Sequence, residues 1–130
     1  MIVVDTSALV AVLKGEPDAQ VFADAVTKDV CLISSVSLLE TSIVLAGRNG
    51  GAPALRPLDE LIEQLKFQVR PHDAALTEIA RQAFLRFGKG RHPAKLNFGD
   101  CAAYALAKSE GLALLFKGGD FAKTDITAAV

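Results

Sequence analysis

Four acidic residues stand at positions where a parallel α/β sheet would bring them together. Asp5 and Asp120 each follow a short apolar run that predicts a buried strand, and Glu40 and Asp100 lie near the starts of two predicted helices. Ligands of open parallel sheets collect at the carboxyl ends of the strands. We therefore expect the four carboxylates to converge at one edge of the sheet.

Converging carboxylates repel one another, and several would be protonated unless cations were present. Oxygen ligands with no neighbouring His or Cys favour Mg²⁺ or Mn²⁺ over Zn²⁺. Mg²⁺ held by a few carboxylates keeps bound waters, one of which can attack a phosphodiester, and a second metal can stabilise the leaving oxygen. The pattern predicts a metal-dependent hydrolase of phosphodiesters in which the four acids are metal ligands and catalytic residues.

Each acid also has a structural interpretation, which the sequence leaves open. Glu40 could complete a capping box with Ser37, although a charge on its largely apolar helix face is costly unless paired. Asp100 falls in the first turn of a helix that Asn97 would cap, where the helix dipole favours an acid. Asp5 and Asp120, which follow strands, are also typical turn residues, and Asp5 could instead cap a helix.

The charges of the chain are unevenly distributed. The net charge is −1, from 14 Lys and Arg against 15 Asp and Glu, yet the stretch between Glu78 and Asp100 holds five cations and no anion. A basic stretch beside an acidic metal site is what a nuclease requires, although a solvated helix end and loop would look the same. The cations expected to contact RNA phosphates are Arg86, Lys89, Arg91, Lys95 and Lys117.

Short apolar runs alternate with segments of helical periodicity. Strands are expected at residues 1–4, 30–33, 67–69 and 112–116, and helices at 8–13, 17–26, 37–46, 57–65, 73–87 and 97–110. Thr6 and Ser7 are expected to cap the first helix, and Pro17 to open the second. This alternation predicts an α/β domain with a mainly parallel sheet.

The length of 130 residues fits a single domain, residues 1–130, and an apolar content of 51% excludes disorder. The longest run without a charge, residues 30–39, is too short to span a bilayer, and the chain lacks the basic start of a secretory signal. We therefore expect a cytoplasmic protein without a membrane partner. Cys31 and Cys101 are expected to be buried free thiols.

The motifs around the acids resemble those of PIN domains and, more narrowly, of VapC-type toxins of type II toxin–antitoxin systems. In chain order they are Asp5-Thr-Ser, Ser37-Leu-Leu-Glu40, Asn97-Phe-Gly-Asp100 and Lys117-Gly-Gly-Asp120. The order and spacing of these motifs, rather than any one of them, carry the resemblance, which covers nearly the whole chain.

The resemblance implies a three-layer α/β/α fold around a mainly parallel sheet of four to five strands. It implies an endoribonuclease that requires Mg²⁺, with Mn²⁺ as a substitute, and that acts as the toxin of a toxin–antitoxin pair. The partners it implies are an RNA substrate, a VapB-like antitoxin and a second copy of the chain, so that both a homodimer and a toxin–antitoxin hetero-oligomer are expected.

The resemblance also assigns roles to residues. Asp5 and Asp100 become the principal metal ligands, Glu40 and Asp120 complete the acidic site, and Thr6 or Ser7 fixes the carboxylate of Asp5. Related sequences often carry an acid or Asn where this chain has Gly119. Asp125 is therefore a candidate to help hold a second metal.

Two alternatives remain. A PIN-like module could bind RNA or a partner without cleaving it. A receiver-type signalling domain also binds Mg²⁺, but it needs a second acid beside Asp5 and an acid after a central strand, where this chain has Arg70-Pro71.

Overall fold

The computed structural model describes residues 1–130 and contains a sheet of four parallel strands. The strand order is β3–β2–β1–β4, with β1 at Ile2–Val4, β2 at Cys31–Ser34, β3 at Gln68–Arg70 and β4 at Leu114–Leu115. Ala128 forms one further parallel bridge with Leu114 at the β4 edge. Because all strands are parallel, their carboxyl ends meet at one edge, as the sequence predicted.

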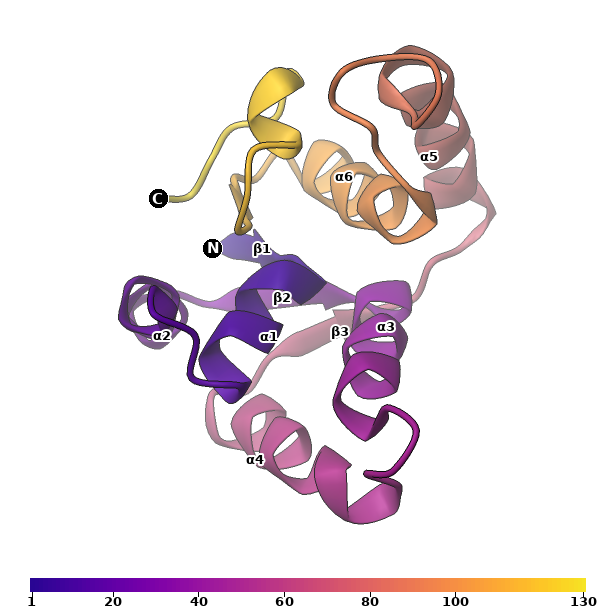
Figure 1. Ribbon diagram of the computed structural model, residues 1–130. Helices are drawn as coiled ribbons and strands as arrows, with labels where there is room; N and C mark the ends of the chain where they lie inside the picture. The colour runs from indigo at the N-terminus through magenta and orange to yellow at the C-terminus, as the bar shows by residue number, and fades with distance from the viewer.

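Six α-helices surround the sheet: α1 (Thr6–Leu13), α2 (Ala19–Lys28), α3 (Ser35–Ala46), α4 (Arg56–Gln64), α5 (Ala74–Phe87) and α6 (Phe98–Glu110). Short 3₁₀ turns, which the sequence did not predict, occupy Ala52–Leu55 and Phe121–Lys123. Helices α5 and α6 lie on one side of the sheet and α1, α2 and α4 on the other, while α3 packs against both α1 and α6 (Figure 1).

Alternating side chains of the strands build a separate core on each face. Val3 and Leu32 pack with α5 and α6, whereas Val4 and Ile33 pack with α1, α2 and α4. Strands buried on both faces read as continuous apolar runs in the sequence. This arrangement confirms the predicted three-layer α/β/α architecture. Because the middles of β1 and β2 are buried on both faces, their polar side chains are found at the strand ends.

Several predicted boundaries differ from those of the structure. The first helix is capped by Asp5, one residue before Thr6, because the carboxylate of Asp5 accepts the Ser7 N–H. The second helix starts at Ala19, after a turn that contains Pro17. The last strand is limited to Leu114–Leu115.

Both cysteines are free and buried, as expected. None of the helices combines the length and the apolar composition needed to cross a bilayer.

Candidate active site at the carboxyl edge of the sheet

Asp5 lies at the carboxyl end of β1 and is only 3% exposed. Its Oδ2 accepts two hydrogen bonds from Ser7, one from the backbone N–H at 3.0 Å and one from the hydroxyl at 2.6 Å. Its Oδ1 is buried and has no hydrogen-bond partner. A buried carboxylate oxygen without a partner is costly, so this atom marks a place for a cation or another donor.

Ser7 connects this carboxylate to the neighbouring strand. Its hydroxyl donates to Asp5 and accepts the backbone N–H of Lys117 at 2.9 Å, just beyond β4. Of the two residues expected to fix the carboxylate, Ser7 does so, whereas the Thr6 hydroxyl is used elsewhere. It donates to the Ser37 carbonyl at 3.0 Å and so ties α1 to the helix that carries Glu40.

Asp100 lies in the first turn of α6, where it forms a capping box with Asn97. The Asn97 side chain accepts the Asp100 N–H at 2.9 Å, and Oδ2 of Asp100 accepts the Asn97 N–H at 3.0 Å. The structural interpretation of this acid is thus confirmed. Because the cap uses only Oδ2, the second carboxylate oxygen remains available for another role.

Glu40 does not form the capping box that Ser37 offered as an alternative. Helix α3 begins earlier than predicted, at Ser35, and its cap is the hydroxyl of Ser34, which accepts the Val36 N–H at 3.2 Å. Ser37 is therefore inside the helix, and its own hydroxyl oxygen is buried without a partner. Glu40 projects from the second turn of α3 and takes no part in capping that helix.

The carboxylate of Glu40 lies against the backbone of Gly99 in the first turn of α6. A Cβ atom added at Gly99 would overlap the carboxylate, with Cδ and Oε1 both 2.6 Å away. The sequence reasoning missed this residue. A glycine inside an otherwise good helical segment, directly before an acid, was the available signal.

The four acids influence one another electrostatically. The pKa of Asp5 is raised from 3.8 to about 6, with burial as the largest cause. The Ser7 hydrogen bonds oppose this rise, and the charges of Asp100 and Glu40 add to it. Burial also raises the pKa of Asp100, to which the charges of Glu40 and Asp120 contribute. The structure thus brings these acids into one neighbourhood, with Asp120 at its exposed side.

Asp125 does not belong to this group. Its carboxylate accepts a hydrogen bond from the Tyr104 hydroxyl at 2.6 Å and pairs with Arg86 at 3.3 Å and Lys108 at 3.1 Å. These contacts fasten the C-terminal segment to α5 and α6. The suggestion that Asp125 replaces a metal ligand beside Gly119 was therefore wrong.

Two of the cations expected to contact RNA are engaged within the chain. Arg86 pairs with Asp125 and lies over the Phe87 ring, 4.6 Å from its centroid. The Lys117 ammonium lies 3.0 Å from both Glu16 and Asp18. The other three, Lys89, Arg91 and Lys95, lie exposed on the loop between α5 and α6.

The donor set fits a hard divalent cation, since the carboxylates of Asp100 and Glu40 are near enough to Asp5 to raise its pKa and Oδ1 of Asp5 has no partner. No group of three or more His, Cys, Asp or Glu side chains is already arranged to hold a metal ion. Mutual repulsion keeps such carboxylates apart, so binding a cation would require them to draw together.

Comparisons with known proteins agree with this geometry. The PIN domain family model matches residues 2–126. A protein named Ribonuclease VapC from Mycolicibacterium smegmatis is 49% identical over 97% of this chain and 98% of its own. Ribonuclease VapC30 from Mycobacterium tuberculosis is 48% identical over 95% of both chains. The chain is a PIN domain of the VapC ribonuclease family. The resemblance inferred from the motifs is confirmed.

Solved structures of VapC-type proteins share this PIN fold. The M. tuberculosis toxin VapC20, described as cleaving the sarcin-ricin loop, superposes with a TM-score of 0.78 at 22% identity over 98% of this chain and 97% of its own. VapBC2 from Rickettsia felis, solved with a fragment of promoter DNA, gives a TM-score of 0.75 at 16% identity over 98% and 96%. At these identities the likeness confirms the fold alone.

The raised pKa of Asp5 predicts a pH-dependent cost to stability in the metal-free protein. Well below pH 3.8 the carboxyl is protonated in both the folded and the unfolded state. Between pH 3.8 and about 6, the Asp5 carboxyl loses its proton in the unfolded chain but keeps it in the folded protein. The free energy of unfolding therefore falls as the pH rises through this range. We expect Asp5→Asn to be up to about 3 kcal/mol more stable than wild type near neutral pH, with the gain vanishing below about pH 3.

Urea unfolding in the presence of a chelator, repeated across this pH range, measures the effect. Asp24→Asn, which alters an exposed acid on α2, is the control and should shift stability by no more than about 0.5 kcal/mol. A gain from Asp5→Asn that does not change with pH would contradict the prediction.

Proposed function

We propose that this VapC-family PIN domain is a metal-dependent endoribonuclease and the toxin of a toxin–antitoxin pair. The observation that carries the proposal is Oδ1 of Asp5, a buried carboxylate oxygen without a partner, surrounded by further acids at the carboxyl edge of the sheet. The relatives named VapC ribonucleases match nearly the whole chain, which supports the same activity here.

Asp5 and Asp100 are the proposed principal ligands of Mg²⁺ or Mn²⁺. Each of them has one oxygen held by the chain, through Ser7 or Asn97, which orients the carboxylate and leaves the other oxygen for the ion. Glu40 and Asp120 complete the acidic site from α3 and from the segment after β4. When bound, the ion would lower the pKa of a coordinated water and offset the charge that develops on the phosphate.

The exposed cations of the loop between α5 and α6 are the proposed contacts to RNA phosphates. No salt bridge within the chain involves Lys89, Arg91 or Lys95. Their positive charges are therefore not offset by nearby acids and can attract a polyanion. Arg86 and Lys117 already form salt bridges with acids of the chain, which weakens their attraction for RNA phosphates.

The main test is RNA cleavage by purified protein with Mg²⁺, with Mn²⁺ and with a chelator. We expect Asp100→Asn to lower the cleavage rate by at least about 100-fold, because several kcal/mol of transition-state stabilisation depend on the ion. Asp125→Asn changes an acid outside the site and should retain cleavage. Mn²⁺ binding followed by electron paramagnetic resonance provides a second measurement, and Asp100→Asn should weaken it.

Cleavage that is equal with and without metal, or equal in wild type and Asp100→Asn, would remove the proposed site. RNA binding and Mn²⁺ binding without cleavage of any RNA would instead favour a non-catalytic PIN module.

A second prediction concerns the contact between Glu40 and Gly99. Gly99→Ala should displace the Glu40 carboxylate and reduce cleavage by about 10- to 100-fold, as losses of supporting contacts in metal sites do. The fold should be retained, and thermal stability should stay equal or rise, because alanine favours helix and the end of the Glu40 side chain can move aside. Gly119→Ala is the matched control, since a Cβ there meets nothing within 4 Å.

Loss of folding in Gly99→Ala, or wild-type cleavage despite it, would contradict this positioning role.

We also propose association with a VapB-like antitoxin and with a second copy of the chain. The Rickettsia felis relative was solved as a VapBC complex, which supports the first partner. Helix α3 exposes Leu39 and Ile43 one turn apart, at 61% and 62%, and such neighbouring apolar side chains suit a self-association surface.

Light scattering on the purified chain should therefore show a dimer, and Ile43→Glu should shift it towards the monomer. A monomer in both proteins, at all concentrations, would contradict self-association through α3.

A further inference from the structure

Lys117 lies just beyond β4, and its side chain joins that segment to the loop between α1 and α2. Its ammonium donates to Oε1 of Glu16 and to Oδ1 of Asp18, with Nζ 3.0 Å from each oxygen. The three side chains are 35%, 33% and 42% exposed, so the group is partly withdrawn from water. Lys117, Glu16 and Asp18 together form a lysine clamp.

Asp18 contributes to this clamp instead of to its own helix. It stands at the N-cap of α2, where an Asp side chain usually accepts a backbone N–H of the first turn, yet it makes no such bond. Its Oδ1 accepts the ammonium of Lys117 instead. The contact therefore serves the segment after β4 rather than helix α2.

The backbone of Lys117 contacts the acidic site. Its N–H donates to Oγ of Ser7 at 2.9 Å, and the Ser7 hydroxyl donates to Oδ2 of Asp5 at 2.6 Å. A hydroxyl carries a single proton, so an N–H at the lone pair of Ser7 directs that proton to Asp5. Oδ2 of Asp5 is thereby occupied, while Oδ1 has no partner. The lysine clamp is therefore connected to Asp5 through one intervening side chain.

The turn after Lys117 has few contacts of its own. Gly118 and Gly119 follow, and a Cβ atom added at either would meet nothing within 4 Å. Gly118 has a φ of +99°, and glycine has more backbone freedom to lose on ordering than any other residue. Between Phe116 and Asp120 only Lys117 has a side chain that can anchor the backbone.

The lysine ammonium is poorly placed to contact RNA. A phosphate would have to displace the two carboxylates that already accept its hydrogen bonds. A partly exposed ion pair also adds little to the free energy of unfolding. The arrangement is better explained by what Lys117 holds in place, which is its own N–H beside Ser7.

We propose that Lys117 is a positioning residue of the metal site. Glu16 and Asp18 fix its side chain, and its N–H then fixes the Ser7 hydroxyl. Ser7 in turn holds Asp5 so that Oδ1 is left for the ion. This inference rests on the proposed function for the identity of the ion. It gives two acids outside the acidic site a part in metal binding, and Lys117 acts through Ser7 rather than on an RNA phosphate.

Mn²⁺ binding followed by electron paramagnetic resonance, without RNA, tests the proposal independently of cleavage. We expect Lys117→Met to bind Mn²⁺ about 10- to 100-fold more weakly than wild type, as losses of supporting contacts in metal sites do. Loss of a positive charge near the acids would on its own strengthen cation binding, so the sign of the effect separates the two causes. Lys117→Arg should restore most of the affinity, because a guanidinium can donate to both carboxylates.

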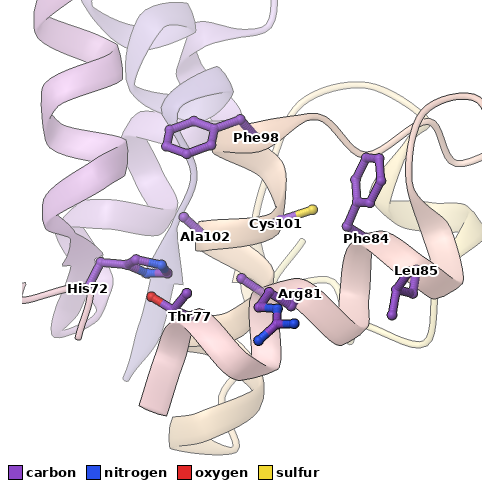
Figure 2. A pocket seen from close by; sticks show the side chains of 9 residues that line it. His72, Thr77, Arg81, Phe84, Leu85, Phe98, Cys101 and Ala102 are labelled. Atoms are coloured by element: carbon purple, nitrogen blue, oxygen red, sulfur yellow. The ribbon is translucent and has the colours of Figure 1, made fainter. Parts of the chain in front are cut away.

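Two matched variants control for the loss of charge and for the loss of an ion pair. Lys123→Met removes an exposed lysine of the same segment that forms no salt bridge, and it should bind Mn²⁺ at least as tightly as wild type. Arg81 forms an ion pair with Glu78, also at 3.0 Å, but at the groove between α5 and α6 that Figure 2 shows. Arg81→Met should leave Mn²⁺ binding unchanged.

A double-mutant cycle tests the route through Ser7. Ser7→Ala should also weaken Mn²⁺ binding. Adding Lys117→Met to it should cause little further loss, because the hydroxyl that Lys117 orients is already gone. Losses that multiply in the double variant would overturn this route.

Wild-type or tighter Mn²⁺ binding in Lys117→Met would overturn the proposal as a whole. Unchanged Mn²⁺ binding together with weaker RNA binding, measured with a chelator, would make Lys117 a phosphate contact instead. Mn²⁺ binding by wild type without cleavage of any RNA, with the predicted order of affinities retained, would refute the proposed activity and leave the positioning role intact.

A second pair of variants keeps the test decisive if Lys117→Met does not fold. Glu16→Gln combined with Asp18→Asn opens the clamp from its other side. This variant should bind Mn²⁺ more weakly than Glu60→Gln combined with Glu63→Gln, which removes the same charge from exposed positions of α4. Equal Mn²⁺ binding by the two double variants would count against the clamp.

Discussion

The half-satisfied carboxylate of Asp5 is the constraint on which the rest of the site depends. The end of β1 is enclosed by both cores, so Asp5 loses its hydration and is compensated by Ser7 at one oxygen only. Bringing Glu40 and Asp100 to the same place raises the pKa of Asp5 further rather than relieving it. An arrangement that costs stability while it is empty is typical of a binding site, where the ligand supplies the missing compensation.

The first turn of α6 performs several tasks because its side chains point in different directions. Asp100 caps the helix with one oxygen and faces the acids, so its structural and chemical interpretations are compatible. Gly99 leaves room for the Glu40 carboxylate, and Phe98 exposes its ring at the start of the helix. The capping box holds this turn rigid, which allows one short segment to position a carboxylate, admit a second and present an aromatic ring.

The distribution of cations shows how a nearly neutral chain can prepare a surface for a polyanion. Acids outside the acidic site neutralise some basic side chains, as Asp125 does for Arg86 and as Glu16 and Asp18 do for Lys117. The loop between α5 and α6 has no such acids, so its cations remain available. Net charge alone conceals this division, because local pairing and not the total sets the field that a ligand meets.

The sequence by itself determined the order of strands and helices, the parallel sheet and the identity of the four acids, because apolar periodicity and strand-end position are local properties. Only the tertiary structure decided which polar groups are satisfied. It moved the start of α3 away from Ser37 and so freed Glu40, directed Thr6 to another helix, and committed Asp125 to Tyr104. It also revealed the role of Gly99 beside the Glu40 carboxylate. Hydrogen-bond partners and close approaches join residues far apart in the chain, so their outcome depends on packing that no local pattern records.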